Sequence, residues 1–197
     1  MKKVIITEKE YRILKEMGEN LESITQDEVR RDIRGKRLVP HDNSSAYIEV
    51  DEIEKYNYKH YIGKKVNVKG DVNLYNLGLK KIPITFGKVG GDFDCYDNSI
   101  TSLEGCPKEV GGSFDCSENN LTSLKGCPSK VGRYFNCQFN AISSLKGCPE
   151  KVKEYFDCSY NKLTSLKDCP SEVGDNFICS NNKKKFTEDE VKSLCKV

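Results

Sequence analysis

The chain has ten cysteines, and theirs are its most reactive side chains, because a thiol can hold a metal ion, form a disulfide or act as a nucleophile. Structural zinc sites use close cysteine pairs such as C-x2-C, whereas the closest cysteines here are ten residues apart. A catalytic thiol needs a base beside it, and both histidines, His41 and His60, precede the first cysteine, Cys95. We therefore expect free thiols that fill apolar core positions, no metal and no cofactor, with metal binding and disulfides as the alternatives.

Aspartates that recur at regular intervals, such as Asp94 and Asp115, are a second group to consider, since paired carboxylates hydrolyse glycosides. A row of such carboxylates is more typical of a solvated surface. The chain has no G-x-x-x-x-G-K-[ST], H-E-x-x-H or G-x-S-x-G motif. We expect a protein that is not an enzyme.

These residues are placed by a repeat of 21 residues. Nine of the cysteines lie on two ladders with this step: Cys95, Cys116, Cys137, Cys158 and Cys179, and Cys106, Cys127, Cys148 and Cys169. The unit reads V-x-x-x-F-x-C-x-x-N-x-(I/L)-x-x-L-x-x-C-P. One unit cannot bury its own apolar face, but stacked units can, with their F-x-C segments paired as a parallel β-ladder. The repeat predicts a solenoid in which Phe114, Phe135 and Phe156 form one buried stack.

The segment FDCSENNLTSLKGCP resembles the short leucine-rich repeat of bacterial effector proteins and of many phage-encoded proteins, with Phe and Cys where that family more often has Leu. The resemblance covers about Val66 to Cys195. It implies a surface that binds a partner protein through the strand face, which is expected to be concave. It further implies a phage or bacterial inhibitor or adaptor that acts on a host system.

The expected fold class is α/β, with three segments. Residues 66–185 form the leucine-rich-repeat solenoid with its parallel β-ladder, beginning with a degenerate coil at 66–87 that about five 21-residue coils follow. Residues 186–197 form a capping helix. That helix is predicted from a capping box and a hydrophobic staple made by Phe186, Thr187, Glu190 and Val191. Residues 1–65 show no repeat and form a small α/β domain.

Aromatic and acidic side chains are expected to point outward from the strand face and to form the contact with the partner. The predicted contact residues are Tyr134, Phe139, Tyr155, Tyr160, Asp115, Glu118, Asp157 and Tyr96. Exposed aromatic residues beside carboxylates are what protein interfaces use as anchors, although strand positions also favour Tyr and Phe for β-propensity alone. The acidic flank favours a partner with a basic surface.

The N-terminal part offers the alternative function. The stretch SITQDEVRRDIRGKRLVP…AYIEVDEIEKY is weakly similar to winged-helix excisionase or MerR-type domains. That similarity implies that Arg30, Arg31, Arg34 and Lys36 contact nucleic acid, which would make the protein a DNA-binding regulator with the solenoid as sensor or dimeriser. Arginine clusters on short helices are more often solvated, and the expected partner is a protein.

The charge balance fits that expectation, because 32 Lys and Arg against 30 Asp and Glu leave a net charge of +2. General polyanion binders have a large basic surplus. The chain has neither an apolar run of membrane-spanning length nor a secretory signal, so we expect a cytoplasmic protein.

Overall fold

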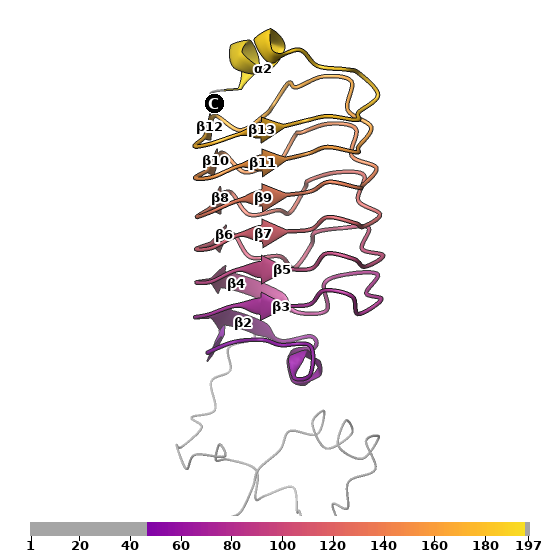
Figure 1. Ribbon diagram of the computed structural model, residues 1–197. Helices are drawn as coiled ribbons and strands as arrows, with labels where there is room; N and C mark the ends of the chain where they lie inside the picture. The colour runs from indigo at the N-terminus through magenta and orange to yellow at the C-terminus, as the bar shows by residue number, and fades with distance from the viewer. Residues whose placement is uncertain (1–46, 196–197) are drawn as a thin grey trace, which may run out of the picture. The chain divides into compact units, whose positions relative to one another are not determined.

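Residues 47–195 are described by the structure, a computed structural model, and they form a β-solenoid of two parallel sheets (Figure 1). The repeat and the solenoid predicted from the sequence are confirmed. The fold class differs from the expected α/β, because in this part of the chain the only helices are the 3-10 helix η2 (Tyr58–Tyr61) and the helix α2 (Glu188–Leu194).

The first sheet has seven strands in the order β1-β2-β4-β6-β8-β10-β12. Their bounds are Ile48–Val50, Lys65–Val68, Thr85–Val89, Glu109–Val110, Lys130–Val131, Lys151–Val152 and Glu172–Val173. This sheet was not predicted, although the sequence contains an indication of it. The valine of the repeat unit recurs in each coil, and it is buried in every coil from Val89 to Val173.

The second sheet is the predicted F-x-C ladder and has six strands in the order β13-β11-β9-β7-β5-β3. Their bounds in chain order are Val72–Asn73, Phe93–Asp94, Phe114–Asp115, Phe135–Asn136, Phe156–Asp157 and Phe177–Ile178. Each strand pairs in parallel with the residues 21 positions away, as Phe114 does with Phe135. In the view of Figure 1 the coils stack in a straight column, and the expected concavity is not visible there.

The core between the two sheets is built from identical residues stacked on one another. Phe114 lies 5.4 Å from Phe135, and Phe135 lies 5.0 Å from Phe156, centroid to centroid, with all three rings fully buried. The predicted phenylalanine stack is therefore confirmed. Burial raises the pKa of the Cys116 thiol well above its usual range, so the inner cysteines fill space and are poor nucleophiles.

The turn that recurs after each F-x-C strand is held by the repeated asparagine. The amide of Asn119 donates to the backbone carbonyls of Cys95, Cys116 and Ser117, and its Oδ1 accepts from the N–H of Ile100. One side chain thus satisfies backbone groups in its own coil and in the coil before it, which is why the repeat needs an amide at this position.

The solenoid begins earlier in the chain than the expected boundary at residue 66. Strand β1 pairs with β2 in parallel, with Ile48 opposite Val66, and Ile53 forms a bridge to Val72 at the start of the second sheet. Residues 47–64 therefore belong to the same compact unit as the repeats.

The C-terminal end carries the helix α2, which has both bonds of the predicted capping box between Thr187 and Glu190. Phe186 and Val191 pack against the core of the last coil. Beyond the helix, Cys195 forms a disulfide with Cys169. All ten thiols were expected to be free, and this pair corrects that expectation. The chain returns from the cap to Cys169, the last cysteine of the Cys106–Cys169 ladder. This contact does not follow the 21-residue step, so the repeat could not predict it.

Candidate protein-interaction surface

The outer face of the second sheet carries the middle residue of each F-x-C segment and, in the first coil, the middle residue of the segment Val72–Leu74. In successive coils this residue is Asn73, Asp94, Asp115, Asn136, Asp157 and Ile178, and we call this set the aspartate row. Because side chains alternate across a strand, the burial of Phe and Cys turns the residue between them outward. The repeat therefore places polar groups in register along the solenoid axis.

Hydrogen bonds within each coil hold the carboxylates of the aspartate row in place. Asp115 Oδ1 accepts from the N–H of Ser117 at 2.9 Å and from its hydroxyl at 2.6 Å. Asn136 Nδ2 donates to Asp115 Oδ2 at 3.0 Å across the coil boundary. Asp157 Oδ1 likewise accepts from the N–H of Ser159 at 2.8 Å. These side chains form a fixed polar surface.

Asp94 is the member of the aspartate row whose carboxyl has a raised pKa. Burial, together with the neighbouring carboxylates of Asp115 and Asp92, raises the pKa of its carboxyl to about 7, although the hydrogen bond from the N–H of Tyr96 acts in the opposite direction. Part of the row is therefore near half-protonation at neutral pH.

Pairs of aromatic rings flank the aspartate row, and each pair joins neighbouring coils. Tyr134 stacks on Tyr155 with ring centroids 4.8 Å apart, and Phe139 stacks on Tyr160 at 4.2 Å. The polar residues Asn136 and Gln138 lie between the two pairs along the chain. The four predicted contact aromatics are thus brought together two by two, with polar side chains between the stacks.

A third stack, formed by Tyr75 and Tyr96 with centroids 5.0 Å apart, was only half predicted. Tyr96 was among the expected contact residues, whereas Tyr75 was missed. The signal was available, since Tyr75 lies 21 residues before Tyr96. The Nζ of Lys55 lies 3.4 Å from the centroid of the Tyr75 ring, which adds a cation–π contact at this end of the row.

The turn residues that follow each strand share a left-handed backbone. Their φ angles lie between 51° and 53°, and in successive coils they are Asn76, Asp97, Glu118, Phe139, Tyr160 and Asn181, which we call the turn column. Asn and Asp adopt this conformation readily, whereas a bulky aromatic residue there is a genuine outlier. Phe139 and Tyr160 are nonetheless 45% and 46% exposed. The fold gains little from an aromatic ring at either position.

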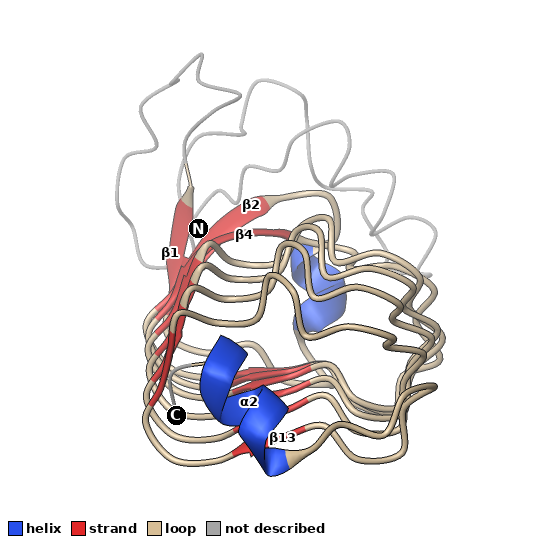
Figure 2. Cartoon of the chain, turned by 90° about the horizontal axis from the view of Figure 1, so that it is seen from above, coloured by secondary structure: helices blue, strands red, loops and turns tan. Residues whose placement is uncertain are grey.

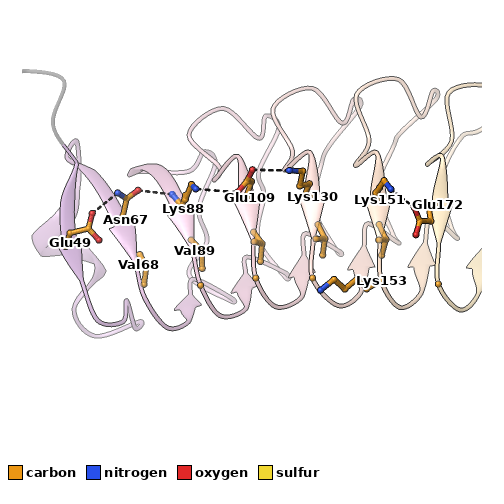
Figure 3. A pocket seen from close by; sticks show the side chains of 17 residues that line it. Glu49, Asn67, Val68, Lys88, Val89, Glu109, Lys130, Lys151, Lys153 and Glu172 are labelled. Carbon is orange, nitrogen blue, oxygen red and sulfur yellow. Dashed lines mark hydrogen bonds and ion pairs between the residues drawn. The ribbon is translucent and has the colours of Figure 1, made fainter.

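A separate groove of about 840 Å³ runs along the outer face of the first sheet (Figure 3). Its rim carries Lys88, Glu109 and Lys130, with Glu109 within 3.6 Å of both lysines, and a further pair joins Lys151 to Glu172 at 2.6 Å. Exposed pairs of this kind each contribute about 0–1 kcal/mol. The charges of these paired residues alternate along the groove and largely offset one another.

The nucleic-acid contacts expected at Arg30, Arg31, Arg34 and Lys36 lie outside the described residues. Among residues 47–195 no group of three or more His, Cys, Asp or Glu side chains is arranged to hold a metal ion. In the same part of the chain no helix has the length and apolar character needed to cross a membrane. Comparison of the chain with protein-family models, with curated proteins and with solved structures yields no match.

Proposed function

We propose that the protein is a non-catalytic scaffold that binds a partner protein through the outer face of the second sheet, with Phe139 and Tyr160 at the centre of the contact. The observation that carries this proposal is the stacked, half-exposed aromatic pair in the turn column. Asparagine and aspartate fill the same position in other coils without strain, so the requirements of the fold do not explain the two rings. Aromatic anchors are typical of interface hot spots.

The charges around the pair favour a partner with a basic surface. Glu118 occupies the turn column one coil before Phe139, and Asp157 lies on the strand that leads to Tyr160. Asp115 lies further along the aspartate row. Carboxylates at the rim of a contact increase the rate of association with a basic surface more than they tighten the complex.

The resemblance of the repeat to short leucine-rich repeats of bacterial effectors and phage-encoded proteins supplies the narrower form of the proposal. The protein would then be a phage or bacterial inhibitor or adaptor, and its partner would be a protein of the host system. The half-exposed stack and its acidic flank are the features that such a partner would contact.

The experiment compares three forms of the immobilised full-length chain in bacterial cell extract: the natural sequence, the double variant Phe139→Asn/Tyr160→Asn, and Tyr56→Asn. Tyr56 is 78% exposed and lies outside this face, so it controls for the loss of a surface ring. A partner should be retained by the natural chain and by Tyr56→Asn. The double variant should bind it at least thirtyfold more weakly, since each hot-spot truncation costs about 2 kcal/mol.

Quantitative mass spectrometry of the three captures decides the outcome. A partner that the double variant retains as well as the natural chain does would place the binding surface elsewhere. The same conclusion follows if no protein is enriched on the natural chain relative to the double variant.

A further inference from the structure

We propose that the open edge of β13 is a second binding site, which takes an extended segment of a partner protein as an added parallel strand. The segment would carry apolar side chains at alternate positions and acidic residues between or beside them. This site lies at the C-terminal end of the second sheet and is distinct from the outer face discussed above. The test of this site is therefore independent of the test of the proposed function.

The direction of the ladder hydrogen bonds shows why the edge of β13 is open. In each interior coil the Phe and the Cys send their N–H groups to carbonyls of the next coil, as Phe156 does to Asn176 and Cys158 does to Ile178. The same pattern directs the N–H groups of Phe177 and Cys179 away from β11. Within residues 47–195 neither N–H group has an acceptor.

A groove of about 1040 Å³ lies directly beside this edge. Residues Asn176 to Asn182 line one side, and the other side is formed by the start of the cap, including Phe186, Glu188 and Val191. Figure 2 shows α2 crossing the end of the solenoid near β13. The cap therefore packs on the core through Phe186 and Val191 but leaves space between its helix and the strand edge.

The lining of the groove sets the side-chain pattern of the added strand. Phe177 stacks on Phe156 at 5.2 Å, and an incoming strand in register would extend that inner column with another apolar side chain. On the outer side the aspartate row ends at Ile178, which is 38% exposed. An apolar edge of this kind beside unpaired backbone groups is the arrangement to which other proteins add a strand.

The charged side chains that line the groove favour acidic residues on the added strand. Lys185 and Lys192 line the groove, and Glu188, the acidic side chain that lines it with them, is paired with Lys192 at 3.5 Å. These three groups sum to one positive charge. A segment that carries carboxylates complements it.

The probe for the test is a fluorescein-labelled peptide that copies residues 113–120, with C116A so that it cannot exchange disulfides. This peptide carries the phenylalanine of the repeat strand, a small apolar residue two positions later and two carboxylates. Binding to the full-length chain is measured by fluorescence anisotropy. The test variant is Cys179→Pro, because proline removes the N–H that the fold does not use and is tolerated at strand edges.

The matched control is Cys179→Ala, which removes the same thiol but keeps the N–H group. Both variants must first show the circular dichroism spectrum and melting temperature of a folded chain. If Cys179→Pro does not fold, Ile178→Lys takes its place, with Ile178→Thr as its control. A charged residue at an edge opposes strand addition, whereas threonine preserves β-propensity.

We expect the peptide to bind the natural chain and Cys179→Ala with similar affinity, and the edge-blocking variant at least tenfold more weakly. The double variant Phe139→Asn/Tyr160→Asn should bind the peptide normally. Equal binding to the blocked and unblocked chains would overturn the proposal, as would the absence of binding to the natural chain at millimolar peptide. Self-association that the edge-blocking variant abolishes would assign the groove to a second copy of this chain and would also overturn it.

Discussion

The rings of Phe139 and Tyr160 stack at 4.2 Å with 14° between their planes, although both residues adopt a φ of 52° that disfavours bulky side chains. The backbone strain and the ring contact oppose each other. A left-handed non-glycine residue costs about 1–2 kcal/mol, so the two residues together cost about 2–4 kcal/mol. The aromatic pair contributes about 0.5–1.5 kcal/mol beyond its buried area, and the half-burial of the two rings contributes about 1.5–3 kcal/mol more. The stack is thus close to neutral for stability.

The first prediction follows from that balance. The double variant Phe139→Asn/Tyr160→Asn should change the free energy of unfolding by less than about 1 kcal/mol, because asparagine tolerates the left-handed turn while the ring contact is lost. Urea denaturation monitored by circular dichroism measures it. A loss of several kcal/mol would show that the two rings are structural.

Phe135 provides the contrast, since its ring belongs to the buried stack. Phe135→Ala should lower the free energy of unfolding by about 3–5 kcal/mol, because it leaves a cavity between Phe114 and Phe156. The same denaturation experiment reports it. A cost below about 1 kcal/mol would mean that the stack does not hold the coils together.

Asn119 should be as important as a core residue despite being polar. Asn119→Ala removes three donated bonds and one accepted bond to buried backbone groups, and should cost about 2–4 kcal/mol. Its exposed neighbour provides the control, because Asn120→Ala keeps the backbone bond from Asn120 to Ile100 and should be nearly neutral. Similar losses for both variants would contradict the role of the asparagine ladder.

Asp94 should make stability depend on pH. Its pKa is about 7 in the folded chain and about 4 when unfolded, so its contribution is fully present below about pH 4 and is lost as the pH rises through 7. Asp94→Asn should therefore match the natural chain at pH 4. At pH 8 it should be more stable by about 1–2 kcal/mol, a figure reduced because solvent reaches the carboxyl and screens it.

Thermal melts of the two chains from pH 4 to pH 8 test this prediction. Asn136, the next amide in the aspartate row, already donates to a neighbouring Asp, which shows that an amide fits the row. The exposed Asp97→Asn serves as the control for the loss of an acidic side chain near this face. Parallel profiles for Asp94→Asn and the natural chain would contradict the high pKa.

The disulfide between Cys169 and Cys195 predicts the thiol count. Titration of the denatured, unreduced chain should find the eight free cysteines, and titration after reduction should find all ten. Cys195→Ala should destabilise the attachment of α2 and lower the free energy of unfolding by about 3 kcal/mol, the effect typical of a loop of this size. Ten thiols before reduction would show that the cap is held by packing alone.

The 21-residue period by itself determined the coil height, the second sheet with its exact register, and the phenylalanine, cysteine and asparagine columns. The reason is that each coil of a solenoid contacts only its neighbours, so every long-range contact repeats at one fixed separation that can be read along the chain. The capping box at Thr187 and Glu190 was equally readable, because its bonds are local.

Contacts that break the period were decided only by the tertiary structure. Strand β1 joins the first sheet from outside the repeat, and Cys195 returns to Cys169 across the cap. The high pKa of Asp94 depends on how deeply its carboxyl is buried, and the open edge of β13 depends on where the stack ends. The 21-residue step sets neither of these features, nor the two contacts from outside the repeat, so only the folded chain shows them.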